Sequence, residues 1–266
     1  MNKSFYVIIV LILIVSGVYF FQTKNTSKTP DIKNVELLLS EKDTPIEVLS
    51  DVKYFEGANG YFVRPIAEGS YPAVLMIHEN RGLRPETKLM AEELAKEGYM
   101  VLAVDLFGKT VETQDEAREL TKAFDQTKGV ENMKAGIEFL RSKGAQKIAS
   151  LGWCFGGKQS VNLSISGEKL DATVVYYGGG MATTTDALKP IAWPVLGIFG
   201  DKDQVIPVEN VKTFESSLNT LGISNEIYIY EGVGHAFANP SGMNYAPEET
   251  KDAWAKTVTF LEKNLK

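Results

Sequence analysis

Residues 147–157 read KIASLGWCFGG, and the fold that we expect for the chain follows chiefly from them. Its first five residues are typical of a buried strand, and a helix is expected to begin near Lys158. Between them Cys154 lies in a G-x-C-x-G pattern, which is typical of a nucleophile on a sharp strand-to-helix turn. The flanking glycines remove side chains that would collide there, and a helix N-terminus favours a thiolate. The alternative is a glycine-rich turn around a buried, inert cysteine.

Two further polar motifs follow predicted strands farther along the chain, GDKD at residues 200–203 and GHAF at residues 234–237. The chain order is therefore nucleophile, acid, histidine, which is the order found in α/β hydrolases. In that arrangement His235 takes the proton of Cys154, or holds the pair as thiolate and imidazolium, while a carboxylate orients the imidazole. The candidate acids are Asp201 and Asp203.

Apolar runs of strand length alternate with segments of helical spacing along most of the chain. Strands that are buried on both faces and separated by helices indicate a mostly parallel, doubly wound sheet flanked by helices, as in the α/β-hydrolase fold. The ligand site of such a sheet lies at the carboxyl ends of the strands. The predicted strands are 52–55, 61–63, 73–77, 100–104, 147–151, 172–177, 195–199 and 227–230, and the predicted helices are 85–97, 112–124, 130–140, 208–221 and 247–265, with one more from near residue 158.

The loop after an early predicted strand reads HENRGL at residues 78–83. In the α/β-hydrolase fold this loop supplies one backbone N–H of an oxyanion hole, and the residue after the nucleophile supplies the other. Asn80 and Phe155 are therefore the candidate donors. Glu79 and Arg81 have two interpretations, a local ion pair at a strand end or a carboxylate that tunes the protonation of the thiol.

The composition narrows the chemistry further. A net charge of −6 and a pI near 5.2 give no electrostatic reason to expect a nucleic-acid partner. The chain has one cysteine and two histidines, which excludes a disulfide within the chain and a four-cysteine metal site. Any imidazole base must be His78 or His235. We expect no metal and no cofactor, a small-molecule substrate and a monomer.

The chain begins with a long apolar segment, FYVIIVLILIVSGVYFF at residues 5–21. As a helix it would reach about 26 Å, close to the thickness of a bilayer core. We interpret residues 1–21 as a transmembrane anchor, and the alternative is a secretory signal cleaved after residue 17. Residues 22–34 are expected to be a polar tether and residues 35–266 a single domain. The domain would then lie outside the cytoplasm, either membrane-anchored or, after cleavage, secreted or periplasmic.

Taken together, the motifs resemble those of the dienelactone hydrolase family of α/β hydrolases. The resemblance runs from about Tyr54 to the end of the chain. It implies that Cys154 is the nucleophile, His235 the histidine and Asp203, rather than Asp201, the acid. It also places the oxyanion donors on the backbone of Asn80 and Phe155, and the family's glutamate near the thiol on Glu79. The motifs that carry it are HENRGL at 78–83, EGYMVLAVDLFG at 97–108, GWCFGG at 152–157, GDKDQVIP at 200–207 and GHAFANP at 234–240.

One departure from the family concerns the substrate. Members that cleave dienelactone grip its carboxylate with arginines, one of which lies four residues beyond the catalytic histidine. Asn239 occupies that position here, and the second arginine falls only roughly on Arg118. A neutral amide cannot replace a bidentate guanidinium at a carboxylate, so the resemblance favours ester or lactone cleavage without specifying dienelactone.

The sequence thus predicts a hydrolase that cleaves a carboxylic ester or lactone through a thioester acyl-enzyme on Cys154. Because a thiolate is itself a good leaving group, we expect turnover only with activated leaving groups, such as an enolate or phenolate. Amides and plain alkyl esters should be poor substrates. Two alternatives remain: a thioesterase or peptide-like hydrolase on the same triad, and a non-catalytic binding domain that kept the fold.

Overall fold

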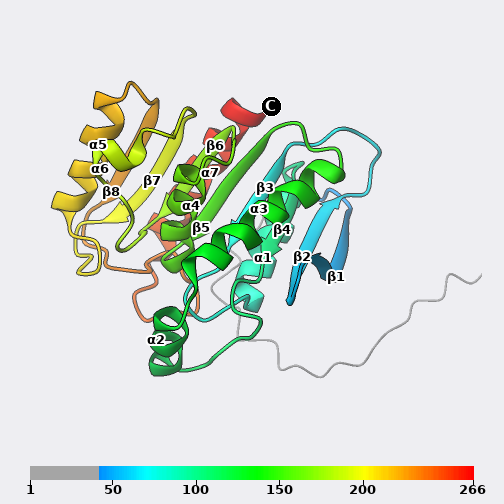
Figure 1. Cartoon of the computed structure of the whole chain (residues 1–266), viewed down its shortest axis with the longest axis horizontal. Helices are drawn as coiled ribbons and strands as arrows, with labels where there is room; N and C mark the ends of the chain where they lie inside the picture. Colours follow the sequence, from blue (N-terminus) through cyan, green and yellow to red (C-terminus); the bar gives the residue numbers. More distant parts are fainter. Residues whose placement is uncertain (1–41) are drawn as a thin grey trace, which may run out of the picture. The chain divides into compact units, whose positions relative to one another are not determined.

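The computed structural model describes residues 42–266, which contain one eight-stranded sheet with helices on both faces (Figure 1). The strand order is β1-β2-β4-β3-β5-β6-β7-β8. The strands are β1 (Ile46–Phe55), β2 (Ala58–Pro65), β3 (Ala73–Ile77), β4 (Met100–Val104), β5 (Ile148–Trp153), β6 (Ala172–Tyr176), β7 (Val195–Gly200) and β8 (Asn225–Tyr230). The helices are α1 (Pro85–Lys96), α2 (Gln114–Lys122), α3 (Gln126–Ser142), α4 (Phe155–Ile165), α5 (Thr185–Leu188), α6 (Val208–Thr220) and α7 (Pro247–Leu265).

The sheet is parallel from β4 to β8, and only β1 and β2 run antiparallel to their neighbours. Every residue of β3, β4, β5 and β6 is buried, as expected for strands covered on both faces. The prediction of a mostly parallel sheet flanked by helices is therefore confirmed. The two leading strands, β1 and β2, are longer than predicted. In β1 a register shift between Leu49 and Val52 interrupts the alternation of side chains, so the sequence pattern indicates only the second half of the strand.

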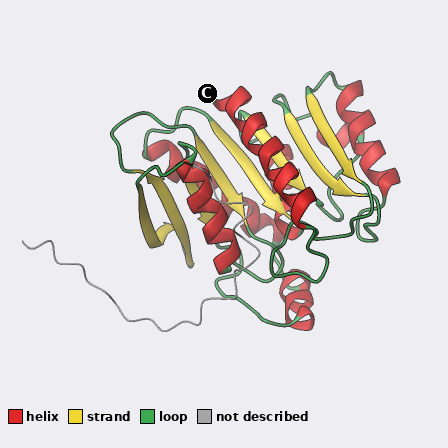
Figure 2. Ribbon diagram, turned by 180° about the vertical axis from the view of Figure 1, so that it is seen from behind, coloured by secondary structure: helices red, strands yellow, loops and turns green. Residues whose placement is uncertain are grey.

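Alternate side chains of the central strands enter two separate cores. Val74 and Met76 of β3 belong to the core that also contains side chains of α1 and α7, whereas Leu75 and Ile77 belong to the core beneath α3. Figure 1 shows α3 and α4 in front of the sheet, and Figure 2, from behind, shows α1 and α7 covering the opposite face. The packing on both faces holds the strand ends in fixed positions, so that the loops after them can carry a site.

The helices differ from prediction at several places. Helix α3 extends beyond the predicted range of 130–140 at both ends and begins at Gln126, because the Asp125 side chain caps its N-terminus. Helix α4 begins at Phe155 instead of near Lys158, because Cys154 itself is the N-cap residue and the turn is therefore tighter than expected. Helix α2 begins at Gln114, where Thr113 and Glu116 form a capping box. The four-residue helix α5 was not predicted, since a single turn has no periodicity to detect.

The predicted anchor over residues 1–21 and the predicted tether over residues 22–34 lie outside the described residues. Within residues 42–266, no helix is both long enough and apolar enough to cross a lipid bilayer.

Candidate active site

Cys154 occupies a strained turn between β5 and α4. Its backbone has φ 52° and ψ −114°, a conformation that side-chain-bearing residues rarely adopt, and its N–H donates to the carbonyl oxygen of Tyr176 at 3.0 Å. The turn requires glycine at position 156, because a Cβ there would overlap the carbonyl oxygens of Ile77 and His78. The local sequence thus forces the sulfur out at the carboxyl edge of the sheet, at the N-terminus of α4.

An imidazole and a carboxylate extend from Cys154 in one connected row. Nε2 of His235 lies 3.0 Å from Sγ of Cys154, and Nδ1 of His235 lies 2.8 Å from Oδ2 of Asp203. Asp203 is buried, and its other carboxylate oxygen accepts the backbone N–H groups of Val205 at 2.7 Å and Ile206 at 3.1 Å. The carboxylate is therefore locked in place with one oxygen directed at the imidazole.

The surroundings of His235 favour its charged form. Burial lowers the pKa of this imidazole, but the hydrogen bonds to Asp203 and to Cys154 outweigh burial and raise the pKa to about 10. Asp201, the other candidate acid, faces away: its carboxylate accepts the Gly232 N–H at 2.7 Å and pairs with Lys202. The structure thus brings Asp203, and not Asp201, to His235.

Two backbone N–H groups lie on the chain segments next to the thiol. Asn80 follows β3, which pairs directly with β5, and Phe155 opens α4 immediately after Cys154. Among residues 42–266, neither the Asn80 nor the Phe155 N–H has a hydrogen-bond acceptor. Both groups remain available to an oxygen of a bound molecule, as the sequence-based prediction requires.

The second histidine, His78, is buried behind this site as a neutral ring. Nδ1 lies 2.6 Å from the carbonyl oxygen of Glu79, and Nε2 accepts the backbone N–H of Leu106 at 3.1 Å. These two bonds require the proton to be on Nδ1. Burial lowers the pKa of His78, in spite of the Glu79 carbonyl and the nearby Asp105 carboxylate. The ring also stacks on Phe155 at a centroid distance of 6.2 Å, so His78 contacts both chain segments that carry the free N–H groups.

Glu79 forms no ion pair with Arg81, so the interpretation of a local ion pair at the strand end is wrong. Its carboxylate instead accepts hydrogen bonds from the hydroxyl of Tyr177 at 3.2 Å and from Nδ2 of Asn239. Burial raises the pKa of Glu79, although the Asn239 amide, the charge of His235 and the Tyr177 hydroxyl all act in the opposite direction. The Asn239 amide therefore binds the carboxylate of Glu79, a group of the protein, at the position where the family's arginine binds a carboxylate of the substrate.

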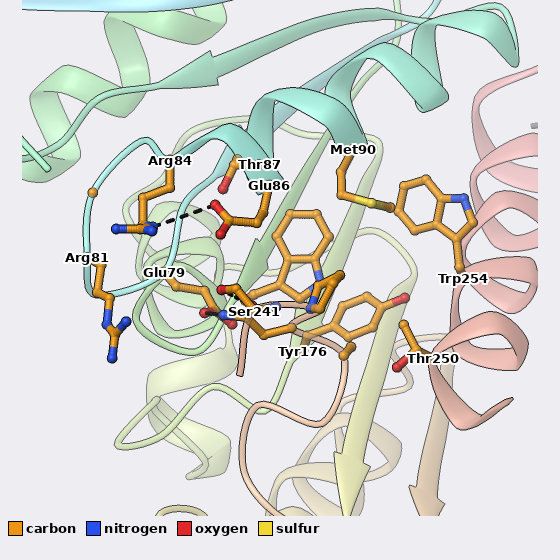
Figure 3. Close-up of a pocket in the computed structure, with 15 residues that line it drawn as sticks. Glu79, Arg81, Arg84, Glu86, Thr87, Met90, Tyr176, Ser241, Thr250 and Trp254 are labelled. Atoms are coloured by element: carbon orange, nitrogen blue, oxygen red, sulfur yellow. Dashed lines mark hydrogen bonds and ion pairs between the residues drawn. The ribbon is translucent and has the colours of Figure 1, made fainter. Parts of the chain in front are cut away.

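A pocket adjoins the Cys154–His235 pair and contains Glu79, Asn239 and Arg81 in its wall (Figure 3). Cys154 itself does not line the pocket, but the preceding residue, Trp153, does. The remaining lining residues are Gly82, Arg84, Glu86, Thr87, Met90, Tyr176, Ala238, Pro240, Ser241, Thr250 and Trp254.

Arg118, the second arginine suggested by the resemblance, is not part of this site. It lies exposed on α2 and pairs with Asp115 at 2.7 Å, among residues that line a different surface depression. The prediction that Arg118 contributes to substrate binding is not supported by this position. Tyr177 was not predicted as a site residue, although its position directly after β6, at the carboxyl end of a strand, could have indicated it. Glu86 and Trp254 were not predicted either, because they reach the pocket from helices and have no local motif.

In the described part of the chain, no three histidine, cysteine, aspartate or glutamate side chains are grouped so that they could hold a metal ion.

The chain is similar in sequence and in fold to known proteins. Residues 58–265 match the dienelactone hydrolase family. A protein of Synechocystis sp. that carries the name carboxymethylenebutenolidase is 27% identical over 78% of this chain and 92% of its own length. Protein usf of Aquifex pyrophilus is 30% identical over 77% of this chain and 93% of its own. A crystal structure named as a dienelactone hydrolase of Klebsiella pneumoniae superposes with a TM-score of 0.74 at 23% identity, over 82% of this chain and 98% of that one, which is a likeness of fold.

Proposed function

Since the chain belongs to the dienelactone hydrolase family, we propose that it hydrolyses a carboxylic ester or lactone with Cys154 as the nucleophile, His235 as the proton carrier and Asp203 as the orienting acid. The observation that carries the proposal is the unbroken row of contacts from sulfur to carboxylate, 3.0 Å and 2.8 Å long. A non-catalytic binding domain would have no need to keep these three side chains in reach of one another.

In the acylation step the sulfur of Cys154 attacks the carbonyl carbon, and the proton that the thiol gave up resides on His235. The N–H groups of Asn80 and Phe155 hold the developing oxyanion, a contact worth about 3 kcal/mol per donor. The C–O bond then breaks, His235 protonates the leaving oxygen, and a thioester remains on Cys154. In the second step His235 takes a proton from water, which attacks the thioester and releases the acid.

Cys154→Ala tests the nucleophile directly. We expect kcat/KM for p-nitrophenyl acetate to fall by about 10³-fold or more, because the remaining donors cannot supply covalent catalysis. Cys154→Ser should also be strongly impaired, since a hydroxyl needs more help from the base than a thiol does. Equal hydrolysis by wild type and Cys154→Ala would exclude this mechanism. Rapid labelling of Cys154 by a thiol reagent at neutral pH separates the enzyme from a non-catalytic domain.

The leaving group decides which substrates turn over. The tetrahedral intermediate collapses forward to the thioester only when the substrate's leaving group departs as readily as the thiolate, so phenyl and enol esters and activated lactones should react and amides should not. A panel of activated esters, enol lactones, thioesters and peptide amides measures this preference. Faster turnover of thioesters or amides than of activated esters would favour the thioesterase or peptide-like alternative.

We also propose that the domain is exported and held at the membrane by residues 5–21, because their uncharged sequence is typical of a membrane-spanning segment. Cell fractionation of the full chain, with N-terminal sequencing of the isolated protein, distinguishes three outcomes. An intact N-terminus in the membrane fraction supports the anchor, a new N-terminus near residue 18 supports the cleaved signal, and an intact protein in the cytosol contradicts both.

A further inference from the structure

One end of the pocket beside Glu79 is built from flat aromatic surfaces. Trp153 and Tyr176 lie with ring centroids 5.5 Å apart, and Trp254 and Met90 continue this wall from α7 and α1 (Figure 3). The hydroxyl of Tyr176 is bonded to the carbonyl oxygen of Ala253 at 3.0 Å, so this residue offers the pocket its ring and not its polar atom. Such a wall accepts the C–H face of a ring.

The other end of the pocket carries an unsatisfied polar pair. Both carboxylate oxygens of Glu86 and the Nε of Arg84 are buried without a hydrogen-bond partner in the described chain. Nε of Arg84 and the Glu86 carboxylate form an ion pair at 3.6 Å, beyond hydrogen-bond distance (Figure 3). Because buried polar groups that make no hydrogen bond are costly, a ligand that supplies hydrogen bonds to both members of this ion pair is favoured. A hydroxyl group can do so, because it donates to Glu86 while it accepts from Arg84.

The charges around the pocket favour a neutral ligand. The guanidinium of Arg84 pairs with the carboxylates of Glu86 at 3.6 Å and Glu112 at 2.9 Å, so its charge is already matched by groups of the protein. Asn239, whose amide donates to Glu79, adds no positive charge to the pocket wall. A carboxylate on the substrate would approach Glu86, and a cation would approach the guanidinium groups of Arg81 and Arg84.

We propose that the pocket bounded by Glu86, Arg84, Trp153 and Trp254 binds a neutral, hydroxylated ring of the substrate, such as a sugar or cyclic polyol unit. The ring packs on the two indoles, and one of its hydroxyls bridges Glu86 and Arg84 after the carboxylate turns toward the pocket. Its acyl carbon then lies on the side of Glu79 and Asn239, toward Cys154. This inference rests on the proposed hydrolase function and specifies its substrate class.

Four p-nitrophenyl esters test the inference with the full-length protein. All four carry a cyclohexanecarboxylic acyl group, and its ring is unsubstituted, trihydroxylated, carboxylated or aminated. We expect the trihydroxylated ester to have the highest kcat/KM, about tenfold above the unsubstituted one, since a hydrogen bond to a charged group is worth that much. A higher value for the carboxylated or aminated ester would overturn the inference in favour of an anionic or cationic substrate.

Glu86→Gln and a matched control locate the preference in the pocket. Glu209 is the second residue of α6 as Glu86 is of α1, and its side chain is 83% exposed, so Glu209→Gln makes the same change at a helix N-terminus outside the pocket. Glu86→Gln should reduce the ratio of hydroxylated to unsubstituted ester by about tenfold, whereas Glu209→Gln should leave it unchanged. An unchanged ratio in Glu86→Gln overturns the inference. Thermal unfolding of both variants shows whether they are folded.

Binding of the primary amides of the same ring acids separates this inference from the proposed function. If the protein cleaves the esters without a preference for hydroxyls, the hydrolase stands and the pocket assignment fails. If no ester is cleaved but calorimetry detects binding of the trihydroxylated amide that Glu86→Gln weakens, the pocket assignment stands and the hydrolase fails. Cleavage with preference, and binding that depends on Glu86, support both.

Discussion

Nε2 of His235 lies 3.0 Å from Sγ of Cys154, although 81 residues separate the two in the chain. The contact exists because β5 and β8 belong to the parallel part of one sheet, where the loops that follow the strands meet at the same edge. Cys154 reaches this edge through a strained turn, and two other residues of the site, Tyr177 and Ala236, also have positive φ angles of 36° and 60°. Backbone strain is thus concentrated where the chemistry is proposed to occur.

The two histidines should titrate in opposite ways. The pKa of His235 is raised from 6.5 to about 10, while burial lowers that of His78. NMR spectra of the nitrogen-labelled protein at about pH 8 should therefore show one imidazolium and one neutral ring protonated at Nδ1. Asp203→Asn should lower the pKa of His235, because it removes the carboxylate that stabilises the charged ring. Two neutral rings at this pH would contradict the structure.

The stability of the protein should depend on His235 over the same range. Because folding raises the pKa of His235 from 6.5 to about 10, the charged ring contributes stability that is fully present below pH 6.5. That contribution is lost as the pH rises through about 10. The difference in free energy of unfolding between wild type and His235→Asn, from denaturant titrations, should shrink across this window. A difference that grows with pH would contradict the assignment.

Asp203→Asn should lower kcat/KM for activated esters by about 10³-fold or more, since an amide can hold the imidazole in the wrong tautomer. The loop should survive the change, because the amide oxygen can still accept the N–H groups of Val205 and Ile206. Asp201→Asn is the matched control in the same loop and should change kcat/KM little. Equal losses in both variants would indicate that the loop, and not the contact with His235, was disturbed.

His78→Gln should lower kcat and leave KM nearly unchanged. The glutamine cannot keep both the bond to the Glu79 carbonyl and the bond from the Leu106 N–H in the geometry of the ring. We therefore expect the Asn80 N–H to shift from its proposed position beside the oxyanion. We expect kcat to fall by about tenfold or more. This loss is smaller than the loss from removing one donor completely, because the N–H is displaced and not removed. Thiol labelling of Cys154 should proceed at the wild-type rate, since His235 and Asp203 are untouched. A change in KM alone would contradict this role.

Asn239→Ala and Tyr177→Phe should move the pH dependence of activity in the same direction. Each removes a donor that lowers the pKa of Glu79, so this pKa, already raised by burial, should rise further in both variants. If ionised Glu79 supports the reaction, the acidic limb of the kcat/KM profile shifts to higher pH in both. The profile is measured with an activated ester between about pH 4 and 9. A limb that stays in place would show that Glu79 does not titrate in the reaction.

Gly156→Ala should be far more destabilising than Gly167→Ala. A Cβ at position 156 would overlap two backbone carbonyl oxygens, whereas nothing lies within 4 Å of a Cβ at position 167. The latter change carries only the cost of a positive φ, about 1–2 kcal/mol. Urea titrations of both variants should show a loss of several kcal/mol, or failure to fold, only for Gly156→Ala. Comparable losses would mean that the turn is less tightly packed than the structure indicates.

Much of this architecture could be predicted from local sequence. The runs at β3 and β4 are apolar throughout and of strand length, and the spacing of α7 is amphipathic, so their boundaries were predicted without error. The G-x-C-x-G pattern likewise predicted that Cys154 lies on a sharp turn between a strand and a helix, because the turn itself requires the glycines. The start of α4 was misplaced, since the sequence does not indicate that Cys154 adopts a positive φ.

The partners of each side chain depended on the tertiary structure. Asp201 and Asp203 lie two residues apart in one loop, and only the packing of β7 against β8 turns Asp203 toward His235 and Asp201 toward Gly232. Glu79 was assigned by pattern, but its bonds to Tyr177 and Asn239 join residues 98 and 160 positions away. Hydrophobic periodicity and turn chemistry act between near neighbours and can be detected along the chain, whereas a hydrogen bond across a sheet edge depends on how the whole sheet packs.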